Sequence, residues 1–352
     1  MITVGIVGAG RAATLHAEAV RAAGSARLAG VAARSSDSPR AAALAEALNS
    51  RVLTVGQLTE ACDAVVVAAP PQARAEILCE LAESPKLKAV MVESPAAATL
   101  DGVTQIQAAF SELPMVAAAN LMHAPAVRRM LDATAAMDPH HLQMRLSLPT
   151  PAGGADDRRA FGGGVMMDQT PGFWPVLLTA LGAGAESVEV QRFEIDDGID
   201  HAVDLTIRAA NGRRAAAALR WGASVAEASF EAADSRRVAR VDVWPTPAVE
   251  INGVPESIPA GSSGHGTGRR AAERTPNPLA ALGYANQIDY LVQVASDSGR
   301  ARPRPDLATA SSALAISAAA ALSIRRNGAE TSLSETPSSL SPLEILTNPS
   351  VA

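Results

Sequence analysis

The sequence predicts an α/β protein of two domains, a parallel sheet wound with helices followed by an α+β domain with an open-faced antiparallel sheet. Up to about Ala119, short apolar runs alternate with helical patterns, which is typical of parallel sheets. Beyond about Met137, strand patterns follow one another, joined by turns such as Ala210-Asn211-Gly212, and Asn-Gly is a strong hairpin signal. At 352 residues the chain is also long for one hydrophobic core.

The first element is a strand that feeds a helix through a tight glycine turn, within Ile2 to Val20. Gly8 permits the turn, Gly10 allows close approach of a pyrophosphate, and the small Ala13 allows the helix to pack on the strand. The start of the following helix offers free N–H groups and a positive dipole end to an anion. A GxGxxA motif in this context indicates a Rossmann dinucleotide-binding domain, which we place at residues 1–121.

Further strands are predicted at Arg27–Ala33, Ala64–Ala69, Ala89–Val92 and Met115–Ala119, with helices between them. Ligands of such sheets bind outside the carboxyl ends of the strands. The residues that we expect to bind the cofactor there are Gly8, Gly10, Arg11, Ala12, Ala13, Arg34, Ser35, Ala69, Pro70, Glu93 and Asn120.

The choice of cofactor depends on the end of the second strand, where an acidic residue would hold a ribose 2′-OH. Here the sequence reads Ala33-Arg34-Ser35. A guanidinium and a hydroxyl favour a 2′-phosphate, so the sequence predicts NADP(H) rather than NAD(H). The alternative is a solvated arginine after a strand.

The second domain is predicted at 122–333, with a helix inserted near Met166–Leu181 and two closing helices within 279–326 that pack back on it. Residues 334–352 form a Ser/Pro-rich tail, either disordered or strapped to another surface. If the apolar positions Val203, Leu205 and Ile207 lie on the outer face of the sheet, they favour a homodimer or homotetramer.

Composition limits the partners. The net charge of −6 gives no basic footprint for nucleic acid or anionic lipid. Cys62 and Cys79 are too few for a disulfide framework or a metal site, and we expect no metal. With neither a signal peptide nor a membrane span in the pattern, we expect a cytoplasmic protein with a small-molecule substrate.

The order of motifs resembles the Gfo/Idh/MocA family (glucose-fructose oxidoreductase, inositol dehydrogenase and MocA). The motifs that carry the resemblance are VGIVGAGRAATLHAEAV, AVVVAAPPQARAEI, VMVESPAAAT, NLMHAPAV and FGGGVMMDQTPGFW, followed by the AANGR hairpin and the closing helices. The resemblance implies a nicotinamide-dependent enzyme whose open-faced sheet often forms an oligomer interface.

This chain departs from the family at its active-site motifs. The family usually has Glu-Lys-Pro where this chain has Glu93-Ser94-Pro95. Its second signature reads Gly-Gly-Gly, three residues, Asp, three residues, His; here Gly162–Gly164 and Asp168 match, but the histidine position holds Gly172. Of the usual Lys-Asp-His set only the aspartate remains. The arginine common in the family's NxRxxP stretch is Met122.

These departures leave the proton transfer unassigned, because serine and glycine are not acids or bases near neutral pH. The catalytic candidates are Asp168, Ser94 and His123; the substrate-binding candidates are Arg158, Arg159, Gly172 and Trp174. Five of them have a simpler alternative: Asp168 as a carboxylate in a helix first turn, His123 as a structural histidine, Arg158 and Arg159 as solvated loop arginines, and Trp174 as a core residue.

The sequence thus predicts an NADP(H)-dependent oxidoreductase that reduces a non-sugar or modified substrate (C=O, C=N or conjugated C=C) in a specialised pathway. One alternative is a catalytically degenerate nucleotide-binding sensor or partner protein. Another is a lyase or hydrolase that uses a tightly bound nicotinamide.

Overall fold

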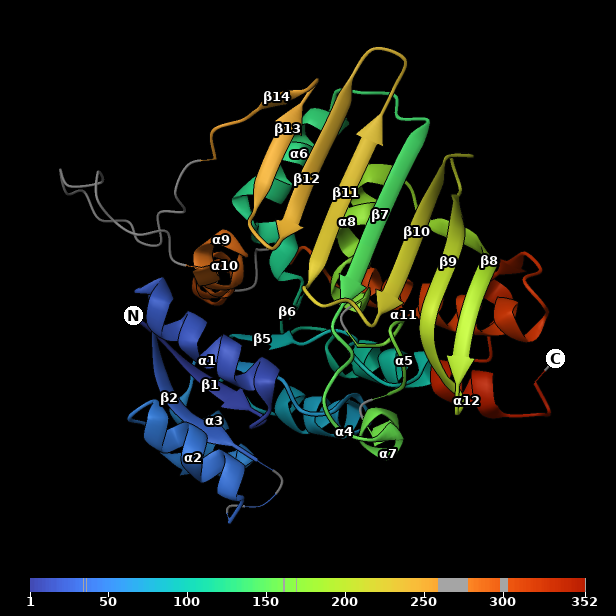
Figure 1. Cartoon of the computed structure of the whole chain (residues 1–352). Coiled ribbons are helices and arrows are strands. Elements are labelled where there is room, and N and C mark those ends of the chain that lie inside the picture. The colour runs from blue at the N-terminus through green and yellow to red at the C-terminus, as the bar shows by residue number, and fades with distance from the viewer. Residues whose placement is uncertain are drawn as a thin grey trace. The chain divides into compact units, whose positions relative to one another are not determined.

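Two compact units make up the chain in a computed structural model that describes residues 1–33, 35, 37–160, 162–168, 170–258, 278–297 and 303–351. The first unit comprises residues 1–97, 102–125 and 259–308, and the second comprises 98–101, 126–258 and 309–352. Figure 1 labels their elements.

The first unit is built on a six-stranded parallel sheet of order β3-β2-β1-β4-β5-β6. Its strands are β1 (Ile2–Val7), β2 (Ala26–Ala32), β3 (Val52–Leu53), β4 (Ala64–Val67), β5 (Ala89–Val92) and β6 (Met115–Ala117). This is the order of a doubly wound dinucleotide-binding sheet, in which the strand order reverses between β1 and β4. The predicted Rossmann domain is therefore confirmed.

Helices connect these strands: α1 (Arg11–Ala23), α2 (Pro39–Ala47), α3 (Val55–Ala61), α4 (Pro71–Ala82) and α5 (Leu100–Ala109). Side-chain caps fix two of their starts. Ser38 accepts a hydrogen bond from the Ala41 N–H of α2, and Thr54 forms a capping box with Gln57 at α3.

The closing helix α10 (Tyr284–Ser296), preceded by the short α9 (Pro278–Ala281), belongs to the first unit. Its apolar stripe, Ile288, Leu291, Val294 and Ala295, joins the core that also holds Val4 and Ile6 of β1. This differs from our expectation that both closing helices pack on the second domain, because a stripe at helical spacing does not say which sheet it covers.

The second unit contains a nine-stranded sheet of order β14-β13-β12-β11-β7-β10-β9-β8-β15. The strands are β7 (His141–Leu148), β8 (Ala185–Asp196), β9 (Ile199–Ala209), β10 (Arg214–Trp221), β11 (Glu227–Ala233), β12 (Val238–Trp244), β13 (Ala248–Ile251), β14 (Val254–Pro255) and β15 (Thr331–Ser332). The predicted hairpin joins β9 to β10, where Gly212 has a φ of +80°. Because β7 and β10 pair in parallel, the sheet is mixed rather than purely antiparallel.

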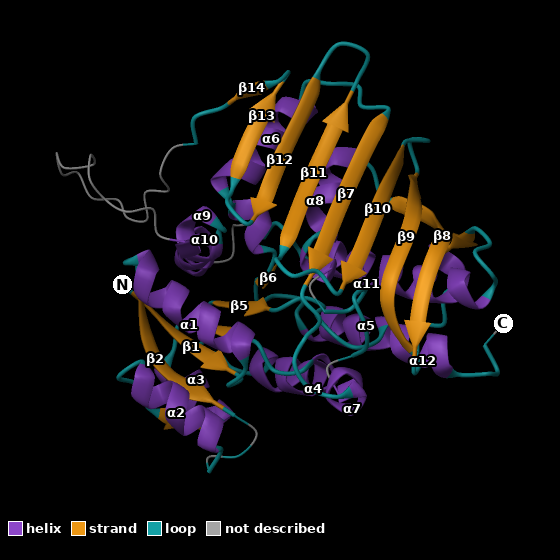
Figure 2. Ribbon diagram, in the orientation of Figure 1, coloured by secondary structure: helices purple, strands orange, loops and turns teal. Residues whose placement is uncertain are grey.

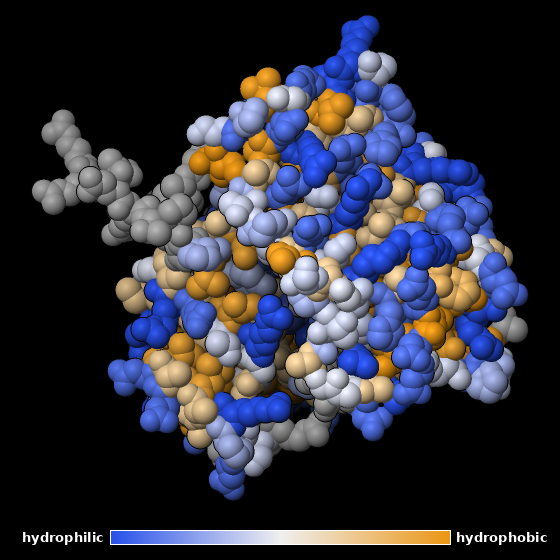
Figure 3. All heavy atoms as spheres, in the orientation of Figure 1, coloured by the Kyte–Doolittle hydropathy of each residue, from blue (hydrophilic) through white to orange (hydrophobic). Residues whose placement is uncertain are grey.

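Helices cover one face of this sheet and leave the other bare (Figure 2). They include α6 (Pro125–Ala135), α8 (Trp174–Leu181) and α11 (Leu307–Arg325). Val203, Leu205 and Ile207 are fully buried on the covered side, so the idea that they form an apolar outer face is wrong. The bare face carries charged pairs such as Arg220–Asp204 and Arg240–Asp242, and Figure 3 shows hydrophilic side chains spread over it.

The tail is structured up to residue 351: it forms η3 (Leu333–Glu335) and α12 (Pro342–Thr347), both in the second unit. Ser341 and Glu344 make a capping box at α12. Within the described residues one helix, Leu307–Arg325, is long and apolar enough to span a membrane, with a mean hydropathy of 1.7. Since 72% of that window is buried in the protein, a core helix accounts for it.

Candidate functional site

The β1–α1 turn has the geometry that a pyrophosphate requires. Gly8 adopts a φ of +127°, and a Cβ there would lie 2.6 Å from the Ala68 carbonyl oxygen at the end of β4. A Cβ on Gly10 would instead meet no atom within 4 Å, so this side of the turn is open. Ala13 is fully buried in the core against the sheet. The conformation of Gly8, the open space at Gly10 and the burial of Ala13 are compatible with the three roles predicted for them.

The start of α1 is free to receive an anion. Its N-cap, Gly10, has no side chain to satisfy the first N–H groups, and Arg11 and Ala12 reach the surface. Uncapped N–H groups and the positive end of the helix dipole both favour a phosphate. The local structure thus fits the pyrophosphate of a dinucleotide.

The end of β2 is only partly described. Arg34, on which the preference for NADP(H) depends, lies outside the described residues. Ser35 is exposed, and its hydroxyl accepts a hydrogen bond from the Asp37 N–H at 3.2 Å.

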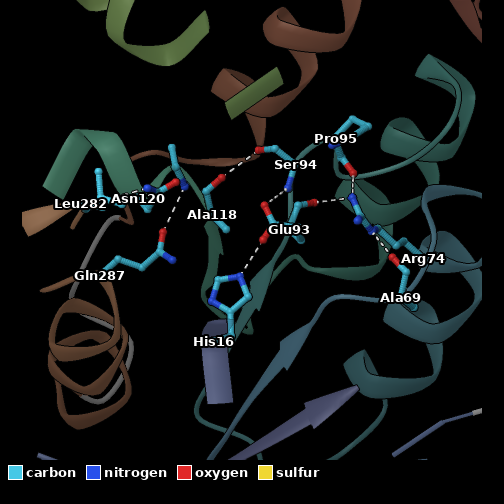
Figure 4. A network of polar contacts seen from close by, with 11 residues as sticks. His16, Ala69, Arg74, Glu93, Ser94, Pro95, Ala118, Asn120, Leu282 and Gln287 are labelled. Atoms are coloured by element: carbon cyan, nitrogen blue, oxygen red, sulfur yellow. Dashed lines mark hydrogen bonds and ion pairs between the residues drawn. The ribbon is translucent and has the colours of Figure 1, made fainter. Parts of the chain in front are cut away.

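A buried guanidinium ties the carboxyl ends of β4 and β5 together (Figure 4). Arg74 of α4 donates from Nε to the Ala69 carbonyl at 2.7 Å and from an Nη atom to the Glu93 carbonyl at 2.6 Å and to the Pro95 carbonyl. Burial lowers the pKa of Arg74 to about 10, although Glu93 opposes this shift. Arg74 thereby fixes both Ala69, which is buried beside the exposed Pro70, and the Glu93-Ser94-Pro95 segment.

Glu93 pairs with a histidine that lies wholly inside the unit. His16 of α1 is 0% exposed, and its Nε2 lies 2.6 Å from Glu93 Oε2. Burial raises the pKa of Glu93, but the hydrogen bond from His16, with the charges of His16 and Arg74, brings it below the usual value. Because an ionised carboxylate only accepts hydrogen bonds, His16 Nε2 carries the proton.

Tyr284 at the start of α10 completes this cluster. Its ring meets His16 edge to face, with centroids 5.9 Å apart. Burial and the nearby Glu93 carboxylate raise the pKa of Tyr284, while Arg11 lowers it to a lesser extent. The phenol therefore stays protonated at neutral pH.

Ser94 is the residue that the motif resemblance aligns with a lysine. Its hydroxyl donates to the Ala118 carbonyl at 2.7 Å, and its N–H donates to Glu93 Oε1 at 2.9 Å (Figure 4). The hydroxyl proton is therefore used in a hydrogen bond to the backbone just after β6, so the side chain has a structural role.

At the end of β6, the side chains pack against the start of α10. Asn120 donates from Nδ2 to the Leu282 carbonyl at 2.7 Å, and the His123 ring contacts the Tyr290 ring at a tilt of 39° with centroids 5.2 Å apart. Gly283 makes this approach possible, because a Cβ there would lie 1.9 Å from the Asn120 carbonyl oxygen. Both residues belong to η1 (Asn120–His123), and these contacts give them a scaffolding role.

In the second unit, a buried carboxylate anchors the glycine run Gly162–Gly164. Asp200 Oδ2 accepts from the Met166 N–H at 2.8 Å, and the Asp200 carbonyl accepts from Val165 at 2.9 Å. A Cβ on Gly164 would lie 2.1 Å from that carbonyl oxygen. Burial raises the pKa of Asp200 to about 7, although backbone N–H groups hold it lower than burial alone would.

The helix that we expected to begin near Met166 begins only at Trp174, after η2 (Thr170–Gly172). Asp168 is exposed in a turn and not in a helix first turn, because the anchored glycine run keeps this segment out of helical geometry. Gly172 is partly exposed, and a Cβ added to it would meet nothing within 4 Å.

Two of the substrate-binding candidates, Trp174 and Arg159, make contacts within the protein. Trp174 is 0% exposed, and its Nε1 donates to the Ser317 hydroxyl at 3.3 Å. Its assignment to a substrate wall is therefore wrong, because Trp174 lies on the apolar face of α8 and is buried in the core. Arg159 pairs with Asp156 at 2.8 Å and with Asp197 at 2.6 Å. Arg158 of α7 (Ala155–Ala160) donates to the Gly153 carbonyl, while its buried Nε has no partner in the described structure.

Sequence reasoning missed Arg74 and Asp200. Arg74 reads as a solvated residue of an ordinary helix, and only its position after Pro70-Pro71, at the strand end, was a signal. Asp200 lies in a strand of alternating polar and apolar residues, and the sequence carried no signal of its role, because its partners are backbone groups in a distant segment.

Comparisons with known proteins agree with this geometry. Residues 2–121 match the model of the Gfo/Idh/MocA family, described as an oxidoreductase family with an NAD-binding Rossmann fold. No curated protein matches the chain in sequence.

Three solved structures are similar in fold. A protein assigned as a myo-inositol dehydrogenase from Sinorhizobium meliloti 1021 is 22% identical, with a TM-score of 0.74 over 95% of this chain and 100% of its own. GenD2 from gentamicin A biosynthesis, in complex with NAD, is 20% identical, with a TM-score of 0.75 over 94% and 96%. A protein assigned as an NADPH-dependent oxidoreductase from Desulfitobacterium hafniense is 16% identical, with a TM-score of 0.76 over 95% and 98%.

The family match covers the β1–α1 turn, the Arg74 clamp and the Glu93-Ser94-Pro95 segment, all of which lie within residues 2–121. The fold likeness extends over nearly the whole chain. Residues 2–121 are therefore similar to the NAD-binding Rossmann part of the Gfo/Idh/MocA oxidoreductases, and the rest of the chain shares the fold of the solved structures.

Proposed function

We propose that this protein is an NADP(H)-dependent reductase of a non-sugar or modified substrate, with C=O, C=N or conjugated C=C as the bond reduced. The observation that carries the proposal is Ser94. In the lysine position stands a hydroxyl whose proton is bonded to the Ala118 carbonyl. Such a group does not take a proton from a sugar alcohol near neutral pH.

The reaction class follows from what the remaining groups supply. The nicotinamide would provide the hydride, which is the difficult part of the chemistry. A protonated imine or a conjugated system needs mainly to be positioned, and this chain holds the segments around Ser94 and Gly164 through buried anchors. Asp168, exposed in its turn, is our candidate for orienting the substrate or donating a proton.

The preference for NADP(H) rests on Arg34 and Ser35 at the end of β2. Fluorescence titration with NADPH and NADH tests it directly. Arg34→Ala should weaken NADPH binding about tenfold or more, as the loss of a charge-assisted contact to the 2′-phosphate predicts, and leave NADH binding unchanged. Equal effects on both nucleotides would contradict the assignment.

The reaction class is tested by restoring the family residues. Ser94→Lys combined with Gly172→His should create NADP⁺-dependent oxidation of myo-inositol that the wild-type protein lacks. A Cβ at position 172 would meet no atom within 4 Å, so the backbone there accepts a side chain. The control is Ser94→Ala, which removes the hydroxyl without supplying a base. Oxidation of myo-inositol by the wild-type protein would overturn the proposal.

Serine at position 94 and glycine at position 172 are also compatible with two other functions. A nucleotide-binding sensor or partner protein would bind NADPH but produce no absorbance change at the cofactor band with any imine, enone or ketone. A lyase or hydrolase that uses its nicotinamide transiently would retain the nucleotide through purification, which the absorbance spectrum of the purified protein reveals.

We also propose that the bare face of the second unit's sheet forms a homodimer or homotetramer contact. The face carries both signs of charge, as in Arg220–Asp204 at 2.6 Å, and a two-fold contact of such a face with itself can pair opposite charges. Sedimentation equilibrium of the wild-type protein and of Arg220→Glu tests this. An oligomer unaffected by the charge reversal would place the contact elsewhere.

A further inference from the structure

A β-bulge at the start of β9 presents a histidine that the site described above does not use. The register between β8 and β9 shifts between Glu194, which pairs with Ala202, and Ile195, which pairs with Asp200. His201 is therefore the extra residue of the bulge. Bulges of this kind re-aim a side chain and are common beside active sites.

The neighbour of His201 across the sheet is a buried tryptophan. Arg220 of β10 pairs with Ala202, so Trp221 lies opposite His201, one position further along the two strands. Their rings meet edge to face at 5.5 Å, with an interplanar angle of 86°. His201 is partly exposed, and its imidazole makes this ring contact.

The indole N–H of Trp221 is a buried donor without an acceptor. Trp221 is 8% exposed, and its Nε1 has no hydrogen-bond partner among the described residues. Leaving a buried donor unsatisfied costs its desolvation, so a polar group without a partner in a native structure calls for an explanation. An indole only donates, which means that a ligand completing it must offer an acceptor atom.

This pair lies at the end of the sheet that anchors the glycine run. Asp200, next to His201, accepts from the Met166 N–H at 2.8 Å. Leu148, the partner of Trp221 in β7, ends its strand there and leads into the segment that carries α7 and Gly162–Gly164. Three strand ends and the anchored loop thus converge on one region of the second unit.

We propose that His201 and Trp221 are a substrate-recognition pair, in which Trp221 Nε1 donates to an oxygen of the substrate and the His201 imidazole makes a second polar contact. The ligand class is a small molecule with an acceptor oxygen, a carbonyl or carboxylate, because an indole N–H only donates. This inference rests on the proposed function, because it assigns residues to the substrate of that reductase.

The test observes the indole N–H directly in the full-length protein. The chain has three tryptophans, so ¹⁵N-labelled protein gives three indole signals, and Trp221→Phe assigns one while keeping an aromatic ring at that position. The probes are pyruvate, which offers a carbonyl and a carboxylate, and myo-inositol, which offers hydroxyls alone, each titrated to millimolar levels with NADPH present. Trp174 is the internal control, because its Nε1 is bonded to Ser317.

We expect pyruvate to shift the Trp221 signal saturably, to leave Trp174 unchanged, and to bind more tightly than myo-inositol. Trp221→Phe and His201→Phe should each weaken pyruvate binding about tenfold, as the loss of one hydrogen bond predicts. A Trp221 signal that neither probe shifts would overturn the proposal, as would equal shifts of Trp221 and Trp174.

NADPH titration of the same samples separates the two proposals. NADPH binding without a Trp221 response removes the recognition pair and leaves the reductase. A Trp221 response without NADPH binding removes the reductase and leaves the ligand site.

Discussion

Two glycines separated by one residue in the β1–α1 turn should respond to the same substitution in opposite ways. Gly8→Ala places a Cβ 2.6 Å from the Ala68 carbonyl oxygen in a backbone with a φ of +127°. Gly10→Ala places a Cβ in open space, at a φ of −90° that any residue adopts. We expect the first change to destabilise the first unit and the second to affect nucleotide binding alone.

The magnitudes follow from the two environments. A non-glycine residue in a sparsely populated backbone region costs about 1–3 kcal/mol, and a clash with backbone that cannot move away costs about 1–3 kcal/mol more. Gly8→Ala should therefore lower the free energy of unfolding by about 2–6 kcal/mol. Gly10→Ala changes only the N-cap residue of α1, for which a loss of less than about 1 kcal/mol is expected.

The effect on nucleotide affinity should be the larger one in Gly10→Ala, when only the folded molecules of the two variants are compared. The space beside Gly10 is where a pyrophosphate approaches the helix, so a methyl group there should weaken NADPH binding about tenfold or more. Urea unfolding and fluorescence titration of both variants measure the two effects separately. Wild-type NADPH affinity in Gly10→Ala would refute the assignment of this turn to the pyrophosphate, and wild-type stability of Gly8→Ala would refute the steric argument.

Three further predictions concern buried charged groups. Arg74→Met should destabilise the first unit by about 3 kcal/mol, because it strands the carbonyls at the ends of β4 and β5, and Arg74→Lys should recover part of this in urea unfolding. Glu93, whose pKa lies below its usual value, stabilises the folded state above about pH 4; in Glu93→Gln this contribution is absent, so the stability gap to the wild type should close as the pH falls below about 4. Asp200, with a pKa raised to about 7, acts in the opposite direction: the folded state holds its proton more tightly, so wild-type stability should fall between about pH 4 and pH 7. Asp200→Asn should abolish that fall, and an unchanged pH profile would contradict the predicted burial of the carboxyl group.

Local patterns were sufficient for the first unit's sheet and for its turn. Gly8, Gly10 and Ala13 act over a few residues, and the unbroken apolar run of β4 reads directly as a buried parallel strand. The Asn211-Gly212 hairpin was also predictable, because a two-residue turn is encoded within itself. That Ser94 and Gly172 stand where the family motifs would have lysine and histidine is a prediction from the sequence, and no structural observation entered into it.

Long-range packing decided the rest. An apolar stripe such as that of α10 can cover either sheet, and only the folded chain shows that Ile288 and Leu291 join the core around β1. Alternation along β9 identified two faces but not which one faces water, so Val203 and its neighbours were placed on the wrong side. Trp174 was misassigned for the same reason.

The sequence by itself determined the glycine turn between β1 and α1 and the fold class, because the turn depends on neighbouring residues and the fold class on the local order of strand and helix patterns. Only the tertiary structure decided how Arg74, Asp200, His201 and Trp221 are used, because their partners are backbone groups and rings on other strands and loops. A side chain's chemistry is fixed by its type, but whether that chemistry is spent on structure or left for a ligand depends on what the fold brings beside it.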